Sequence, residues 1–206
     1  CRSGVAIRGI VEAGNVCAKD CFYCGIRKSN TNVSRYIFSE DQIVDAAENA
    51  YRAGFHSIVI QSGEIESEQH TSIIENALHR IAHLKLGVTL SLGEQTFDPL
   101  QRWKAAGASR YLLRIETSSP ELYRTLHPQS CSWERRKECL VNLRRLEYQV
   151  GTGVMISLPG QTLDDLADDI LFFEKINADM IGMGPYIPHC DTPLASSTLP
   201  QIAKSK

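Results

Sequence analysis

Short apolar runs alternate with amphipathic helical patterns along almost the whole chain. The runs are rich in Val and Ile, have the length of strands, and occupy residues 5–13, 56–62, 88–92, 110–115, 150–157 and 178–184. Strands that are apolar on both faces and joined by helices are typical of a parallel sheet with right-handed crossovers. The alternation therefore predicts an α/β fold of about six βα units.

Capping signals mark where the intervening helices begin. Ser39 followed by Gln42, and Thr162 followed by Asp165, are capping boxes in front of apolar stripes. Glycines close several of these patterns, as expected for helix C-termini. Further helices are expected over residues 72–87, from 98 to 107, as a short turn from 119, and from 132 to about 148.

A parallel sheet of this kind is either a TIM-like barrel or an open doubly wound sheet. No G-x-G-x-x-G follows the first strand and no G-x-x-x-x-G-K-[ST] occurs, which argues against dinucleotide and P-loop folds. A closed barrel needs about eight strands and roughly 250 residues. We therefore expect an incomplete TIM-like barrel, a single core domain over residues 1–206 that is truncated at its C-terminus.

Charge and cysteine content narrow the class of protein. The net charge of −2 predicts no basic surface for nucleic acid or anionic lipid, and no apolar stretch is long enough to span a membrane. Seven cysteines, an odd number, without a signal peptide favour reduced thiols over a disulfide framework. The expected location is the cytoplasm, or an anaerobic organelle in a eukaryote.

Chemically active side chains follow the strands at their carboxyl ends. A cysteine-rich loop follows the first strand, Glu64 the second, Glu94 the third, and Arg114 and Glu116 the fourth. In parallel α/β folds these ends form one rim, where active sites lie. The convergence predicts an enzyme.

The loop holds Cys17, Cys21 and Cys24 in a C-x3-C-x2-C pattern. Three thiolates can bind three irons of a [4Fe–4S] cluster and leave the fourth iron open to a small molecule. A structural zinc ion would need a fourth Cys or His close by, and the nearest downstream histidine is His56. The pattern favours an iron–sulfur cluster, with zinc or a structural thiol cluster as the alternatives.

Residues 17–24 resemble the signature of the radical S-adenosylmethionine superfamily, and Gly25 fits the residue that commonly follows it. The resemblance implies that the amino and carboxylate groups of S-adenosylmethionine chelate the open iron. It also implies reductive cleavage of that cofactor to methionine and a 5′-deoxyadenosyl radical, with the cofactors supplying the reactive chemistry.

Within the superfamily, segments in order along the chain resemble the HydE family of [FeFe]-hydrogenase maturases: "GIVEAGNVCAKDCFYCGIRKSN", "IVIQSGE", "VTLSLGE", "RYLLRIETSSPELYRTLHP" and "MIGMGPYIPHCDTPLA". This implies a small-molecule or iron-complex substrate, a reduced ferredoxin or flavodoxin-type electron donor, and the maturation proteins HydG and HydF as partners. Methylornithine synthase and biotin synthase are the nearest alternatives, and a non-catalytic zinc-binding module is the alternative from another class. The chain departs from the family at Cys190, where proline is more common, and at Cys131, which lies in a local insertion.

The resemblance also implies roles for individual residues. Cys17, Cys21 and Cys24 would bind the cluster. S-adenosylmethionine would contact Tyr23, Ser62, Gly63, Glu64, Glu116, Arg136, Arg144, Met155 and Ile187. The substrate cavity would be lined by Ser91, Thr89 and Arg110.

Most of these residues have a structural interpretation as well. Glu64 and Glu94 could stabilise helix N-termini, Arg136 lies in the charged segment "ERRKE", and Met155 suits a core. His79 and His83 have metal-ligand spacing but are expected on a solvated outer helix face. Cys131, Cys139 and Cys190 are expected to be ordinary thiols, with Cys139 in the core.

Overall fold

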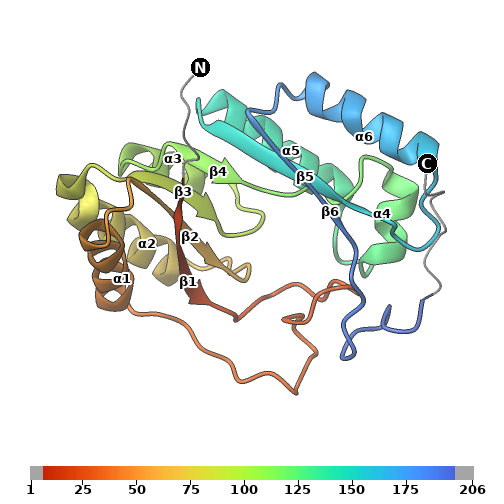
Figure 1. Cartoon of the computed structure of the whole chain (residues 1–206), viewed down its shortest axis with the longest axis horizontal. Helices are drawn as coiled ribbons and strands as arrows, with labels where there is room; N and C mark the ends of the chain where they lie inside the picture. The colour runs from red at the N-terminus through yellow and green to blue at the C-terminus, as the bar shows by residue number, and fades with distance from the viewer. Residues whose placement is uncertain (1–6, 198–206) are drawn as a thin grey trace.

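Six parallel strands stand side by side in sequence order in residues 7–197, the part of the chain that the computed structural model describes (Figure 1). They are β1 (Gly9–Gly14), β2 (Ser57–Ser62), β3 (Gly87–Ser91), β4 (Arg110–Leu112), β5 (Gln149–Ile156) and β6 (Met180–Pro185). A doubly wound sheet reverses its strand order at a switch point, whereas this order never reverses. The predicted barrel type is therefore confirmed, and within residues 7–197 β1 and β6 are free edges of a sheet that does not close.

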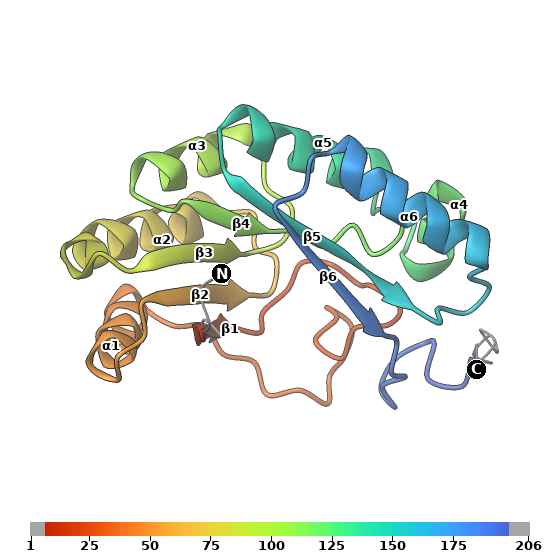
Figure 2. The same ribbon diagram turned by 45° about the horizontal axis from the view of Figure 1, so that its top comes forward.

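Helices follow the strands and lie along one face of the curved sheet (Figure 2). They are α1 (Glu40–Arg52), α2 (Glu68–Ile81), α3 (Phe97–Ala105), α4 (Pro120–Leu126), α5 (Trp133–Arg145) and α6 (Leu163–Lys175). A one-face arrangement is what right-handed crossovers produce when each strand is added to the same edge. None of the helices among residues 7–197 has both the length and the apolar character that crossing a membrane requires.

The local signals place most element boundaries correctly. Both capping boxes form, at Ser39 before α1 and at Thr162 before α6. The prediction over residues 72–87 is wrong at both ends, because α2 already begins at Glu68 and a 3₁₀ turn over Ala82–Leu84 leads into β3. The first strand begins at Gly9, and residues 5 and 6 of its predicted range lie outside the described residues.

The core fills the space between the sheet and its helices. Ile58, Ile60, Leu90 and Tyr111 on the strands and Trp103 on α3 are fully buried there. Side chains alternate between the faces of a strand, so the neighbours of these residues point to the opposite, concave face of the sheet. That face and its carboxyl end are the part of the fold that remains for a functional site.

Candidate active site

The segment that carries the three cysteines crosses the carboxyl end of the sheet. From the end of β1 it runs over to the segment that follows β6 (Figures 1 and 2). Backbone hydrogen bonds from Phe22 N to Leu126 O (2.9 Å) and from Leu194 N to Phe22 O (3.2 Å) tie it to α4 and to that last segment. We call residues 15–30 the cysteine loop. The fold thus places this loop over the strand ends, as expected.

The end of β2 packs directly against the cysteine loop. Glu64 N donates to Cys17 Sγ at 3.3 Å, and Ala18 N donates to Glu64 O at 2.8 Å. A Cβ atom on Gly63 would lie 2.2 Å from Val16 O, so only glycine allows this approach. The predicted segment of Ser62, Gly63 and Glu64 therefore contacts the cysteine loop at Cys17 directly.

Arg35 fixes the backbone of the cysteine loop from below. Its guanidinium donates to the carbonyl oxygens of Asn15, Ile26, Arg27 and Asn30 at 2.6–3.0 Å. Carbonyls that point toward one another repel unless a shared donor satisfies them, and guanidinium offers five N–H donors in a fixed geometry. The sequence contained no signal for this residue, because its partners are defined only by the folded loop.

The thiols of the loop are spaced too widely for one metal ion. Among residues 7–197, three Cys, His, Asp or Glu ligand atoms lie within 4.8 Å of one another only at His189, Cys190 and Asp191, not at Cys17, Cys21 and Cys24. Thiolates around a tetrahedral zinc at about 2.3 Å must lie closer together than that. The three thiols thus lack the spacing of a single-ion zinc site, whereas a cluster whose irons each take one cysteine does not require that spacing.

Burial raises the pKa of two thiols of the loop, Cys21 and Cys24, and so favours their protonated form in the absence of a metal. It raises the pKa of Cys21 to about 12, with nearby Arg136 opposing the shift, and it also raises the pKa of Cys24. A bound metal ion deprotonates the thiols that coordinate it. Cys21 and Cys24 would therefore become thiolates when they coordinate a metal centre.

Two carboxylates and two cations form a buried network beside the cysteine loop. Lys19 Nζ lies 3.1 Å from Glu64 Oε1 and 3.3 Å from Glu94 Oε2. Glu94 N donates to Glu64 Oε2 at 2.7 Å, and Arg136 Nε lies 3.0 Å from Glu94 Oε1. Glu94 is fully buried, so its charge depends on these two cations.

The network holds its protons unevenly. Burial lowers the pKa of Lys19, but attraction from Glu64 and Glu94 outweighs burial and leaves that pKa raised. Burial and the charge of Glu94 raise the pKa of Glu64 by more than Lys19 lowers it. Lys19 stays charged, and Glu64 takes up a proton more readily than an ordinary glutamate does.

A second chain of contacts runs from the cysteine loop to Arg136. Tyr23 Oη lies 3.1 Å from His127 Nε2, and His127 Nδ1 lies 2.9 Å from Tyr123 O. Since a carbonyl only accepts, Nδ1 carries the proton and Nε2 accepts from Tyr23. Burial lowers the pKa of His127 to about 3, so the ring is neutral. Arg136 Nε completes the chain by donating to Tyr123 Oη at 3.2 Å.

The structure brings several predicted cofactor residues to this rim. Tyr23 and Met155 pack against the buried apolar group of Leu122, Leu126, Leu158 and Tyr186. Glu116 lies at the end of β4, 3.2 Å from Arg114 Nε, and burial raises its pKa. Ser62 Oγ donates to Gly63 O, and Ile187 lies beyond β6 with 77% of its side chain exposed.

Two of these side chains face protein groups and not solvent. Glu64 is 4% exposed and Arg136 is 7% exposed. Arg136 also donates to Arg114 O at 2.7 Å. Both residues were expected to contact S-adenosylmethionine. In the structure, Glu64 pairs with Lys19 and Arg136 pairs with Glu94 instead.

Two predicted positions do not belong to the rim. Arg144 bonds Ile176 O and pairs with Asp179 at the amino end of β6, because eight residues of helix carry it about 12 Å from Arg136. Arg110 begins β4 and donates to Gln149 Oε1 at the same far end of the sheet. Arg144 is thus corrected to a structural ion pair. Arg110 lies opposite Thr89 of β3, at the end of the sheet that is far from the cysteine loop, so its predicted role beside the substrate is limited to that end.

The other two substrate candidates lie along β3 on that concave face. Ser91 is half-buried at the carboxyl end of the strand, and Thr89 lies two residues earlier, opposite Arg110. Thr89 is 1% exposed and its hydroxyl has no hydrogen-bond partner among the described residues. The structure therefore makes Ser91 the member of the set nearest the cysteine loop.

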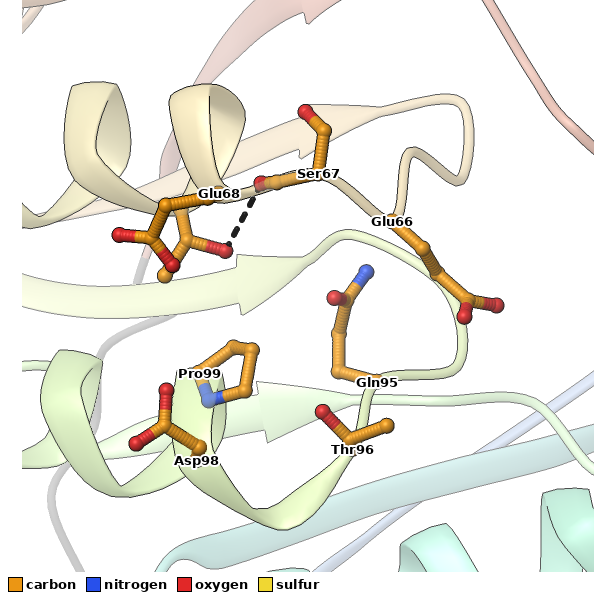
Figure 3. Close-up of a pocket in the computed structure, with 8 residues that line it drawn as sticks. Glu66, Ser67, Glu68, Gln95, Thr96, Asp98 and Pro99 are labelled. Atoms are coloured by element: carbon orange, nitrogen blue, oxygen red, sulfur yellow. Dashed lines mark hydrogen bonds between the residues drawn. The ribbon is translucent and has the colours of Figure 1, made fainter.

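A pocket of about 260 Å³ opens just outside the charged network, between the N-termini of α2 and α3 (Figure 3). It is lined by Glu66, Ser67, Glu68, Thr71, Gln95, Thr96, Asp98 and Pro99. Glu66 pairs with Arg135 at 2.5 Å, and Glu68 pairs with Arg102 at 2.8 Å. Its acidic side chains are thus neutralised by neighbouring arginines, and it does not contact the cysteines.

The remaining candidates match the structural interpretation. His79 and His83 are exposed on the outer side of the helical layer, and Cys139 is buried in the core. Cys131 is half-buried and Cys190 is exposed, and both are free thiols. Lys19, His127 and Tyr123 were missed; a lysine inside the spacing "CAKDC", facing two carboxylates, was the one available signal.

A curled parallel sheet with a three-cysteine loop across its carboxyl end defines a TIM-like core for radical chemistry. The sequence profile of the Radical SAM superfamily matches residues 11–173, and the chain belongs to that superfamily. A [4Fe–4S] cluster, which the cysteine spacing favoured, and S-adenosylmethionine, which the resemblance implied, are the cofactors of this superfamily.

Three relatives show how the chain compares with known proteins. It is 47% identical over 192 residues to the [FeFe] hydrogenase maturase subunit HydE of Thermotoga maritima, covering 93% of this chain and 55% of the relative. The structure of methylornithine synthase (PylB) matches with a TM-score of 0.83 at 21% identity, covering 95% of this chain and 59% of that one. The maturase HydG of Carboxydothermus hydrogenoformans matches with a TM-score of 0.82 at 20% identity, covering 97% and 48%. The chain thus spans about half the length of each.

Proposed function

We propose that this chain is the cofactor-binding part of a HydE-type enzyme, which uses S-adenosylmethionine in the maturation of [FeFe] hydrogenase. The observation that carries the proposal is the 47% identity to the Thermotoga maritima maturase over 93% of the chain. The likeness to methylornithine synthase is a likeness of fold, at 21% identity. Methylornithine synthesis and biotin synthesis are therefore the weaker candidates.

In this proposal the cysteine loop holds the cluster through Cys17, Cys21 and Cys24, one iron each. When bound, the cluster and S-adenosylmethionine together supply reductive cleavage of the sulfonium to a 5′-deoxyadenosyl radical. The spacing of the thiols supports the fit, because Cys17, Cys21 and Cys24 do not gather within 4.8 Å of one another as the ligands of a single ion do.

The residues around the loop would bind and orient the second cofactor. The backbone of Ser62 and Gly63 lies against the loop and is free of bulk, so it suits the methionine end. Glu116, buried at the end of β4, suits ribose hydroxyls. Tyr23, Met155 and Ile187 supply the apolar surface that an adenine ring needs. Glu64 and Arg136 would hold these residues and the cysteine loop in place without contacting the cofactor, since both side chains are bonded to protein groups.

The wider setting follows from the same proposal. The substrate would be a small molecule or an iron complex held near Ser91, and the electron donor a reduced ferredoxin or flavodoxin-type protein. HydG and HydF would be its partners in maturation. Six free cysteines among residues 7–197 suit a reducing compartment, the cytoplasm or an anaerobic organelle.

Iron and sulfide analysis tests the cluster. Anaerobically purified chain should carry about four irons and four sulfides, and a brown colour that dithionite bleaches. Alanine at Cys17, Cys21 or Cys24 should abolish this content, whereas Cys131→Ala and Cys139→Ala should leave it intact. One zinc per chain without sulfide would refute the proposal.

The open iron and the reaction need a second test. S-adenosylmethionine should change the electron paramagnetic resonance spectrum of the reduced cluster, and a four-cysteine cluster would not respond. A HydE protein in which this sequence replaces the matching residues of the Thermotoga maritima maturase should restore hydrogenase activity in cells that lack HydE. Formation of methylornithine or biotin without hydrogenase rescue would assign the chain to the other family members.

A further inference from the structure

The segment that follows β6 brings three different metal-ligand side chains together. A ring nitrogen of His189, the thiol of Cys190 and a carboxylate oxygen of Asp191 lie within 4.8 Å of one another. Among residues 7–197 they are the one set of three such residues with this spacing. Consecutive residues in an extended chain point to alternate sides, so this convergence requires a turn.

Hydrogen bonds hold that turn in place. Asp191 N donates to His189 Nδ1 at 3.1 Å. Thr192 binds His189 O twice, through its backbone N (3.1 Å) and through its Oγ1 (2.7 Å). The two Thr192 bonds order the backbone of the turn independently of the ring, so the turn persists, and less entropy is lost, when the ring nitrogen exchanges the Asp191 N–H for another partner.

Asn32, just after the cysteine loop, and Gly25 within it contact the same turn. Asn32 Nδ2 donates to Asp191 Oδ1 at 3.2 Å. A Cβ atom on Gly25 would lie 2.9 Å from the His189 ring, so the ring rests against the backbone next to Cys24. Gly25, which also fits the superfamily signature, thus leaves the space that the His189 ring occupies.

We propose that His189, Cys190 and Asp191 form a second metal site, for a single thiophilic divalent cation such as Zn²⁺, beside the cysteine loop. An imidazole nitrogen, a thiolate sulfur and a carboxylate oxygen are the three donor types that zinc takes in proteins. Binding converts the Cys190 thiol to a thiolate, and its proton passes to the solvent. At the ring, the cation replaces the Asp191 N–H as the partner of the Nδ1 lone pair.

The site shares no ligand with the cysteine loop and holds its cation through three protein groups. Three ligands leave a fourth position open in a tetrahedral ion, as in catalytic zinc sites. Cys190 and His189 are exposed, so that position is open to solvent and to a substrate donor atom at the same rim. The site does not depend on which radical reaction the chain performs.

Cobalt replaces zinc in such sites and reports thiolate ligation by its charge-transfer absorption. The probe is Co²⁺ alone, added anaerobically to a chain that carries Cys17→Ala and Cys24→Ala, so that the cysteine loop cannot hold it. We expect a thiolate-to-cobalt band that saturates at one equivalent and that excess Zn²⁺ removes. Adding Cys190→Ala should abolish the band, and adding His189→Ala should weaken the affinity about tenfold or more.

Cys131→Ala in the same background is the matched control, because Cys131 is a second free thiol of the rim. It should leave the band unchanged. Circular dichroism checks that the background folds, and zinc content measured on the otherwise unaltered chain, with and without Cys190→Ala, gives an independent count that should fall by one. A band that persists without Cys190, the absence of any band, or an equal zinc count would overturn the proposal.

Discussion

At the scale of single residues, charge burial dominates the site. Glu94 is fully buried at the end of β3 and touches Lys19 from the cysteine loop and Arg136 from α5. Removing one partner from a buried ion pair leaves an uncompensated charge, and that loss exceeds the net value of the pair. The carboxylate therefore stabilises the rim even where it contacts no ligand.

Glu94→Gln should lower the free energy of unfolding by about 3–5 kcal/mol, because two buried cations lose their shared anion. Chemical denaturation measures this value. Glu121→Gln removes a carboxylate that lies 3.5 Å from Arg124 on the surface of α4, and it should change stability by less than about 1 kcal/mol. Equal effects of the two substitutions would contradict the network.

Gly63 allows a prediction about contact between backbone segments. Gly63→Ala would place a Cβ atom 2.2 Å from Val16 O. Because both contacting groups are backbone, the end of β2 and the cysteine loop would have to move apart to relieve the clash. We expect a loss of about 1–3 kcal/mol or more, together with reduced iron content. Gly184→Ala is the matched control, because a Cβ at that position meets nothing within 4 Å. Iron content unchanged in Gly63→Ala would show that the loop does not rest on β2.

At the scale of elements, the two capping boxes predicted the starts of α1 and α6 correctly, whereas the Ser67 cap of α2 was missed. Thr162 accepts from Asp165 N and the Asp165 side chain accepts from Thr162 N, as the sequence pattern indicated. At α3 the sequence suggested Asp98 and Pro99 as the start. The helix begins one residue earlier, after Thr96, whose side chain makes no capping hydrogen bond. The two helices thus differ in how their first turn is satisfied.

Thr162→Ala should destabilise the protein by about 0.5–2 kcal/mol, because it leaves orphan N–H groups at the start of α6. Thr96→Ala should have an effect near zero, since no capping bond is lost at α3. Thermal unfolding of the two variants checks this difference. A larger effect at Thr96 would mean that its hydroxyl caps α3 after all.

His70 gives α2 a dependence on pH. Both of its ring nitrogens are buried without a hydrogen-bond partner in the described part of the chain, and burial lowers its pKa from 6.5. The unfolded chain therefore binds a proton that the folded chain refuses. The contribution of His70 to stability is complete above pH 6.5 and is lost as the pH falls below that value, by at most about 1.4 kcal/mol per pH unit.

His70→Leu should remove that loss. The variant should lose less stability between pH 7.5 and pH 5 than the parent chain does, in denaturation curves measured at each pH. His79→Leu, on the exposed side of the same helix, should leave the pH dependence of the parent unchanged. If the two variants gave the same curve, the burial of His70 would not be the cause.

At the scale of the whole molecule, the order of strands was predictable and the assembly of the site was not. Apolar periodicity specifies each strand, and right-handed crossovers then leave few ways to arrange six of them. Glu94, Lys19 and Arg136 are separated by 42 and 75 residues, so no local pattern links them. Arg144 was expected at the rim because it lies on the same helix as Arg136. Position on a helix does not say which end of the sheet a given turn is near, and Arg144 lies near the amino end of β6.

The free edge of the sheet leads to the last prediction. β6 forms hydrogen bonds with β5 on one side, and within residues 7–197 no strand covers its other side. Ile181 and Met183 on β6 are 52% and 41% exposed, and Ile170 and Leu171 on α6 are 59% and 61% exposed. An unpaired strand edge flanked by apolar side chains is a template for pairing with another chain.

This 206-residue chain should therefore self-associate as its concentration rises, measured by sedimentation velocity. Ile181→Lys with Met183→Lys should shift it toward monomer, whereas Val141→Lys, at an exposed apolar position on α5, should not. A parent chain that stays monomeric throughout, or a Val141 variant that matches the β6 variant, would show that this edge is not the sticky surface.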